Sequence, residues 1–249
     1  MPAPFTLVFD LDDTLYLERD FVRSGFTAVG RWLRAEKGIR GFEAICTELF
    51  AAGERMQVFN QALDHLGLGA EPDLLAKLIH VYRTHEPQIT LADDARRYLE
   101  SATGPHALIT DGFLATQEAK VRVLKLDQSF GQVLCTACLG AGFGKPHPRC
   151  FEITEAWARP FGRPLVYVAD NPLKDFVTPK ARGWLTVQVA RPERVHLCAA
   201  PDARYEPHAS VASLDELDEC LHALTRNKPA GIFLTGSEAF ASLATEGSR

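Results

Sequence analysis

Two aspartates one residue apart follow an apolar segment near the N-terminus, and they are the residues most able to do chemistry. Residues 5–9 have the composition of a buried strand, and Asp10 and Asp12 come directly after it. Open α/β sheets bind ligands at the carboxyl ends of their strands. Two carboxylates this close repel each other unless a cation or a shared proton lies between them. The pair therefore indicates metal-assisted carboxylate chemistry.

Further polar positions follow three other apolar segments that are expected to be strands. These are Thr110 at the end of residues 106–110 with Asp111 and Gly112 after it, Lys145 beyond residues 132–136, and Asp170 and Asp175 after residues 165–169. Because parallel strands bring their carboxyl ends to one edge of a sheet, these side chains are expected to converge with Asp10 and Asp12.

The order of strand and helix patterns predicts the fold that brings these residues together. From about residue 92 strands alternate with helices, including strands at 185–189 and, weakly, 210–212. This alternation predicts an α/β fold, a Rossmann-like doubly wound parallel sheet with helices on both faces.

A helical insert separates the first strand from the rest of this pattern. Apolar residues recur at helical spacing through residues 17–89, so this segment is expected to form a separate helical cap. Residues 1–16 and 90–227 are then assigned to the α/β core. Residues 228–249 are compatible with a packed arm, an oligomer contact or disorder, so a homo-oligomer stays open.

Taken in order, the four strand-end motifs resemble those of the haloacid dehalogenase-like hydrolase superfamily. They read Phe-Asp10-Leu-Asp12-Asp-Thr14-Leu, Leu-Ile-Thr110-Asp111-Gly112, Gly-Lys145-Pro146-His-Pro148 and Val-Ala-Asp170-Asn171-Pro-Leu-Lys-Asp175. The resemblance covers roughly residues 5–190, and the helical insert is placed like the α-helical cap of that family. The family more often carries asparagine where this chain has Asp111.

The resemblance implies a role for each catalytic residue. Asp10 would attack phosphorus and form an aspartyl-phosphate, and Asp12 would protonate the leaving group and later deprotonate water. Lys145 would restrain Asp10 and bind phosphoryl oxygens. Thr110, with the backbone amides of Asp111 and Gly112, would bind the same oxygens.

The resemblance also implies a metal ion at this site. A dianionic phosphate beside buried aspartates requires added positive charge, and a small hard cation with oxygen ligands, Mg²⁺, fits best. Asp10 and Asp170 are expected as direct ligands, Asp12 through its backbone carbonyl, and Asp175 as a ligand or as a residue that orients bound water.

The predicted function is a magnesium-dependent phosphatase that acts on a small soluble phosphomonoester, of the nucleotide or sugar phosphate class. Asp12 favours phosphoryl transfer over dehalogenation, because a departing halide needs no proton. Two alternatives stay open, namely a phosphosugar mutase of the same superfamily and a non-catalytic binding or regulatory protein. Either would keep the fold and differ in the fate of the phosphoryl group.

Composition limits the partners and the location of the protein. The net charge of −5 on 249 residues, with scattered lysines and arginines, gives no attraction toward nucleic acid polymers or anionic lipids. No run reaches the roughly 18 to 20 apolar residues that a membrane span requires. A phosphorylated small molecule is therefore the expected partner, and the protein is expected to be cytoplasmic, with free thiols on its six cysteines.

Overall fold

The structure, a computed structural model, describes residues 5–226 and divides into two compact units. Of the described residues, the α/β unit contains 5–17, Leu91–Gly112 and 125–226. The helical unit contains Glu18–Thr90 and Phe113–Leu124. The expected tail at 228–249 lies outside the described residues.

Within the described residues, the α/β unit is built on a parallel sheet of six strands in the order β3-β2-β1-β4-β5-β6. The strands are β1 (Thr6–Phe9), β2 (His106–Thr110), β3 (Gln132–Cys135), β4 (Leu165–Ala169), β5 (Leu185–Val189) and β6 (Ala209–Val211). The chain runs outward from β1 to β3 and then crosses to β4 on the other side of β1. This is a doubly wound Rossmann-like sheet, as the alternating pattern predicts, and its strand order reverses between β1 and β4.

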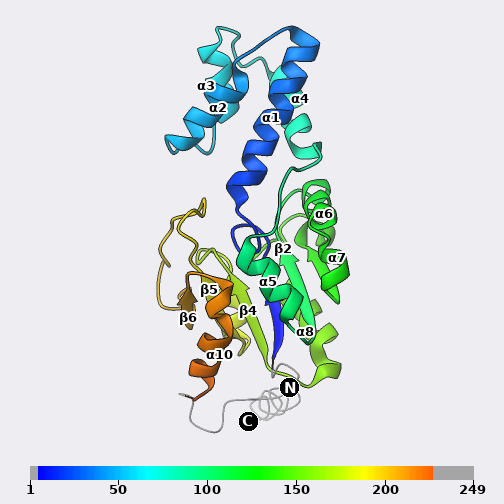
Figure 1. Cartoon of the computed structure of the whole chain (residues 1–249), viewed down its shortest axis with the longest axis vertical. Helices are drawn as coiled ribbons and strands as arrows, with labels where there is room; N and C mark the ends of the chain where they lie inside the picture. The colour runs from blue at the N-terminus through cyan, green and yellow to red at the C-terminus, as the bar shows by residue number, and fades with distance from the viewer. Residues whose placement is uncertain (1–4, 227–249) are drawn as a thin grey trace, which may run out of the picture. The chain divides into compact units, whose positions relative to one another are not determined.

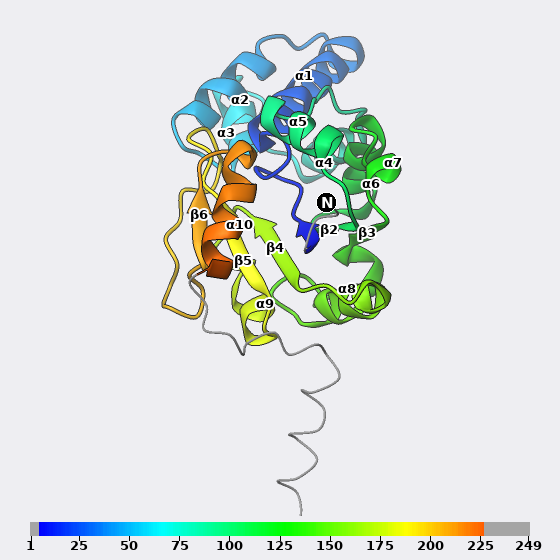
Figure 2. The same cartoon turned by 60° about the horizontal axis from the view of Figure 1, so that its bottom comes forward.

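Helices cover both faces of this sheet because successive strand residues point to opposite sides. On β1, Phe9 packs edge-to-face against Tyr98 of α5, whereas Val8 lies in a buried cluster with Phe151 of α8. Figure 1 shows α5 and α10 on the same side of the sheet, and Tyr98 there donates a hydrogen bond to Asp218 at 3.0 Å. Figure 2 shows α8 and α9 away from these two helices.

The helices of the α/β unit are short, and most of them lie in the connections between successive strands. They are α5 (Asp93–Ser101), α7 (Leu126–Ser129), α8 (Arg149–Ala158), α9 (Val177–Ala181) and α10 (Leu217–Arg226), with 3₁₀ turns at Thr136–Leu139, Arg159–Phe161 and Leu214–Glu216.

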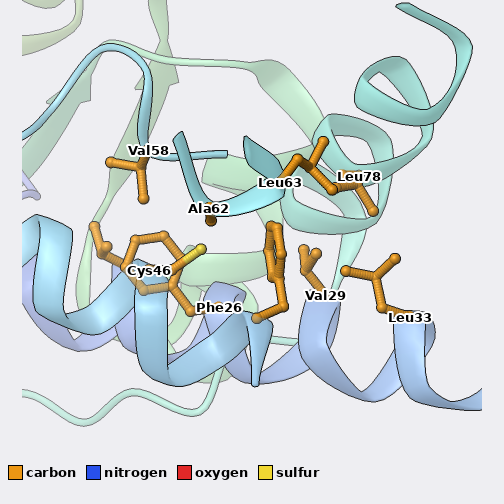
Figure 3. Packing of buried hydrophobic residues seen from close by; sticks show 10 residues of the cluster. Phe26, Val29, Leu33, Cys46, Val58, Ala62, Leu63 and Leu78 are labelled. Atoms are coloured by element: carbon orange, nitrogen blue, oxygen red, sulfur yellow. The ribbon is translucent and has the colours of Figure 1, made fainter. Parts of the chain in front are cut away.

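The helical unit is held together by an apolar core of its own. Its helices are α1 (Glu18–Lys37), α2 (Phe42–Ala51), α3 (Val58–His65), α4 (Pro72–Thr84) and α6 (Leu114–Val123). On α1, Val22, Phe26, Val29 and Leu33 recur at spacings of three and four, so they share one buried face. Figure 3 shows Phe26, Val29 and Leu33 together with Leu63 of α3 and other side chains of the cluster.

Helix α6 departs from the sequence-based assignment, which gave it to the α/β core because it follows a strand. It groups with the helical unit instead, through polar contacts. The Thr116 hydroxyl donates to the Arg83 carbonyl at 2.7 Å, and Arg122 pairs with Glu86 at 2.6 Å. The Lys120 ammonium lies 4.3 Å from the centre of the Phe21 ring. Hydrophobic periodicity carries no sign of such contacts, so the sequence pattern does not indicate this grouping.

In the part of the chain that the structure describes, every helix is too short or too polar to cross a lipid bilayer.

The tight packing of the helical unit's core predicts that a cavity there lowers the stability of the unit. Leu63 is fully buried in it, so Leu63→Ala should destabilise the unit by about 2–5 kcal/mol through lost burial and an unfilled cavity. The measurement is the urea midpoint followed by far-UV circular dichroism. Leu68, which is 38% exposed, provides the matched control, and Leu68→Ala should change stability by less than about 0.5 kcal/mol. Equal losses in the two variants would contradict this core assignment.

Candidate active site

The strand-end residues expected from the sequence lie along the carboxyl edge of the sheet. Asp10 directly follows β1, Thr110 ends β2 and Asp170 directly follows β4. Since β1 is hydrogen-bonded to both β2 and β4 in parallel register, the three positions are neighbours at the point where the strand order reverses. All three residues are almost fully buried. The carboxyl edge of the sheet therefore holds a cluster of buried polar side chains, and these strand ends are not exposed to solvent.

Lys145 is the cation at the centre of the site. Its Nζ atom lies 2.8 Å from Asp10 Oδ1 and 2.7 Å from Asp175 Oδ1, and it donates to the Tyr167 hydroxyl at 2.9 Å. Burial alone would lower the pKa of Lys145, but the two carboxylates outweigh it and the net pKa lies well above the ordinary lysine value. Lys145 therefore stays charged and fixes the position of Asp10.

One lysine does not balance the acids around it. Asp10, Asp170 and Asp175 each place a carboxylate oxygen within 4.8 Å of the others, and all three are buried. Burial raises the pKa of Asp10 to about 6, although Lys145 opposes the rise. Burial, together with the charges of Asp10 and Asp175, raises the pKa of Asp170 to about 9. The three acids therefore cannot all be ionised near neutral pH unless a further cation offsets their mutual repulsion.

The residues present fit a small hard divalent cation such as Mg²⁺. The ligand set is made of carboxylate oxygens, which this ion prefers. Within the described residues Asp170 Oδ2 is buried and has no hydrogen-bond partner, which is the condition expected of an oxygen that faces a metal ion. The sequence prediction also included Asp12 through its backbone carbonyl, whereas the three clustered side chains are those of Asp10, Asp170 and Asp175.

Asp111 positions the loop that carries Lys145. Its carboxylate accepts hydrogen bonds from the Lys145 backbone amide, at 3.2 Å for each oxygen, and from the Thr136 hydroxyl. It also lies 3.8 Å from the Lys174 ammonium. Gly112 follows with φ at 146°, a conformation that favours glycine. The acid at position 111 therefore has structural partners on the Lys145 loop.

Asp175 performs a similar task for the loop after β4. Its Oδ2 atom accepts a hydrogen bond from the Asn171 backbone amide at 3.0 Å, while its Oδ1 atom pairs with Lys145. The Gln188 side chain of β5 donates to the Asp170 carbonyl at 2.8 Å. These contacts hold the backbone on both sides of the Asp170 carboxylate, so its direction is set before any ligand binds.

Asp12 lies at the edge of the site and is half-buried. Its carboxylate accepts a hydrogen bond from the Tyr16 hydroxyl, and the two residues also form an isolated backbone bridge. Sequence reasoning missed Tyr16, because a tyrosine four residues after an aspartate carries no signal without the turn that joins them.

Asp13 and Arg191 anchor the turn between Asp12 and Leu15, and sequence reasoning assigned neither of them a task. Asp13 is fully buried and accepts a hydrogen bond from the Val195 amide at 2.6 Å. Arg191 donates to the Thr14 carbonyl at 2.8 Å and pairs with Asp94 at 2.9 Å. A buried arginine after the fifth strand could not be distinguished in the sequence from a solvated one.

The chain matches the family of hydrolases described as haloacid dehalogenase-like hydrolase over residues 6–156. This range spans the Asp10, Thr110 and Lys145 positions. No curated protein matches the chain by sequence.

Solved structures with the same fold come from several bacteria. A 2-haloacid dehalogenase from Pseudomonas syringae pv. tomato is 25% identical, with a TM-score of 0.59, and the match covers 88% of this chain and 99% of that one. A putative hydrolase of the family from Bacillus subtilis, bound to magnesium, is 18% identical with a TM-score of 0.61, over 87% and 98% of the two chains. A family hydrolase from Deinococcus radiodurans with bound phosphate and sodium is 22% identical with a TM-score of 0.57, over 92% of this chain and 100% of that one.

Since the family match extends over more than half of the sequence and the fold agrees with it, this chain belongs to the haloacid dehalogenase-like hydrolases.

Proposed function

We propose that this protein is a magnesium-dependent phosphatase that hydrolyses a small phosphomonoester through an aspartyl-phosphate on Asp10. The observation that carries the proposal is the arrangement of two carboxyl groups with different surroundings. Asp10 is buried and held by Lys145, whereas Asp12, two residues on, is half-buried and hydrogen-bonded to Tyr16. One group is suited to attack and the other to proton transfer.

The reaction then has two steps in which this chain supplies the reacting groups. An Asp10 oxygen forms a bond to phosphorus, the ester bond from phosphorus to the leaving oxygen breaks, and Asp12 donates its proton to that oxygen. In the second step Asp12 takes a proton from water, whose oxygen attacks phosphorus and releases Asp10 and inorganic phosphate. Asp12 is protonated again at the end, so the cycle closes.

Lys145 and the remaining acids set the electrostatics of these steps. Lys145 holds the Asp10 carboxylate in a single orientation and carries a permanent positive charge. Asp10 and Asp170 would bind Mg²⁺, and Asp175 would orient its water ligands. When bound, the ion neutralises charge on the phosphoryl oxygens. Thr110 at the end of β2 and the backbone amides of Asp111 and Gly112 would donate hydrogen bonds to those oxygens.

Hydrolysis at a carbon–halogen bond is the second candidate, because the similar Pseudomonas syringae protein is a 2-haloacid dehalogenase. A halide leaves carbon as a stable anion and needs no acid, whereas an alkoxide leaving phosphorus does. The carboxyl group of Asp12 therefore favours the phosphatase. A phosphosugar mutase or a non-catalytic binding protein would keep the same site, and the experiment below separates them from a phosphatase.

The proposed function predicts release of inorganic phosphate in a screen of small phosphomonoesters with magnesium. The same preparation should release no halide from 2-haloacids, and Asp10→Asn should lower phosphate release by at least about a thousandfold with an unchanged circular dichroism spectrum. Halide release, or phosphate release that survives Asp10→Asn, would contradict the proposal. Transfer of phosphate between hydroxyls of one sugar without net release would identify a mutase.

Proton transfer by Asp12 predicts a dependence on the leaving group. Asp12→Asn should lower kcat/KM by about 10² to 10⁴-fold for alkyl phosphates, and far less for p-nitrophenyl phosphate, whose leaving group needs little protonation. Steady-state rates over a series of phenyl phosphates measure this slope. The exposed Asp93→Asn provides a control with the same charge change. A loss that is equal across all leaving groups would remove Asp12 from the role of general acid.

The cluster of three buried acids predicts a thermal effect of magnesium that needs no substrate. Saturating Mg²⁺ should raise Tm by roughly 5 °C or more relative to protein in chelator. Asp170→Asn should lose this shift without lowering the Tm in chelator, because the raised pKa of Asp170, about 9, leaves its carboxyl group protonated near neutral pH without metal, so the amide removes no charge there. Scanning calorimetry of both proteins checks this. A full magnesium shift in Asp170→Asn would show that the ion binds elsewhere.

A further inference from the structure

Lys174 is a second cation at the candidate active site, beside the paired acids. It lies in the loop after β4, one residue before Asp175. Its ammonium is 3.8 Å from Asp111 Oδ2, and its charge also acts on the Asp10 and Asp170 carboxylates. The resemblance to the family gives no task to this position, and the proposed mechanism does not use it.

The two lysines of the site differ in how firmly they are held. Lys145 has a fully buried side chain and short contacts with two carboxylates and a tyrosine. The Lys174 side chain is 32% exposed, and its contact with Asp111 is longer than a hydrogen bond. Partly exposed ion pairs of this kind contribute little to stability, typically about 0–1 kcal/mol. Replacing this contact with a stronger one therefore costs little free energy.

The acid on the other side of this contact has better partners than Lys174. Asp111 accepts hydrogen bonds from the Lys145 amide and the Thr136 hydroxyl, so it stays in place if Lys174 leaves. Asp111 directly follows Thr110, the residue expected to bind phosphoryl oxygens. A lysine that leaves Asp111 consequently starts beside the place where the anionic substrate would bind.

We infer that Lys174 is a substrate-binding residue whose ammonium exchanges its weak contact with Asp111 for an anionic oxygen of the substrate. The inference deepens the proposed phosphatase function and rests on it. The oxygen belongs either to the phosphoryl group or to a second anionic group, such as a carboxylate, on the leaving group. In both cases Lys174 selects substrates by their negative charge, and it does so without disturbing the buried ion pairs that Lys145 makes with Asp10 and Asp175.

The test measures anion binding and turnover separately for Lys174→Met, with Lys125→Met as the control. Lys125 is exposed, belongs to the same unit and loses the same charge. Calorimetric titration with inorganic phosphate in magnesium gives a Kd that does not depend on catalysis. Values of kcat/KM for phenyl phosphate and 4-carboxyphenyl phosphate then compare substrates with and without a second anionic group.

Binding to the phosphoryl group predicts that Lys174→Met raises the Kd for phosphate about tenfold and lowers kcat/KM alike for both substrates. Binding to a second anionic group predicts a loss for 4-carboxyphenyl phosphate alone. An unchanged Kd together with unchanged kcat/KM, or equal losses in Lys125→Met, would overturn the inference. If the protein has no phosphatase activity, the proposed function fails, and the phosphate Kd alone then decides whether Lys174 binds an anion.

A second variant tests the exchange itself. In Asp111→Asn the ammonium of Lys174 loses its carboxylate partner, so Lys174→Met should weaken anion binding by a larger factor in that background than in the unmodified protein. Equal factors in the two backgrounds would overturn the exchange between Asp111 and substrate.

Discussion

The contact on which this site depends is the Lys145 ammonium buried between the Asp10 and Asp175 carboxylates. Removal of one partner from such a pair typically costs about 3–5 kcal/mol, because the other charge is left buried and alone. The lysine is therefore fixed, and so is the carboxylate proposed as nucleophile. Asp170 is a third buried acid, and its raised pKa shows that the three carboxyl groups resist ionising together. A divalent cation would supply positive charge both to these buried acids and to an anionic substrate that binds beside them.

The rest of the α/β unit maintains this arrangement. The strand order places Asp10 and Asp170 directly after adjacent strands. A separate anchor holds each loop, namely Asp111 for the Lys145 loop, Asp175 for the loop after β4, and Arg191 for the turn after β1. Each anchor is a charged side chain bound to backbone groups. Such contacts fix loops that have no regular hydrogen bonding of their own. The site is thus preorganised by electrostatics more than by apolar packing.

The parts of this account that the sequence could predict are those with a periodic or positional signal. Alternating apolar segments located the six strands, and the strand ends located Asp10, Thr110, Lys145 and Asp170. Contacts between distant polar residues have no such signal. Helix α6, which the sequence assigned to the α/β core, contacts the helical unit through Thr116 and Lys120, and neither contact has a sequence signal. Asp13 was given no task, since its partner is a backbone amide far along the chain at Val195. The pattern of apolar residues in a sequence indicates which side chains are buried. Contacts between polar residues far apart in the chain depend on the folded structure and leave no such pattern.

The most direct test of the central claim is the identity of the residue that carries the phosphoryl group during turnover. Asp12→Asn should accumulate the intermediate with p-nitrophenyl phosphate, because the first step then needs little acid while the second lacks its base. After an acid quench, mass spectrometry should find the mass of one phosphoryl group on the peptide that contains Asp10, and no phosphoryl group in Asp10→Asn. A phosphoryl group on another residue, or continued turnover with Asp10 unmodified throughout, would contradict the account.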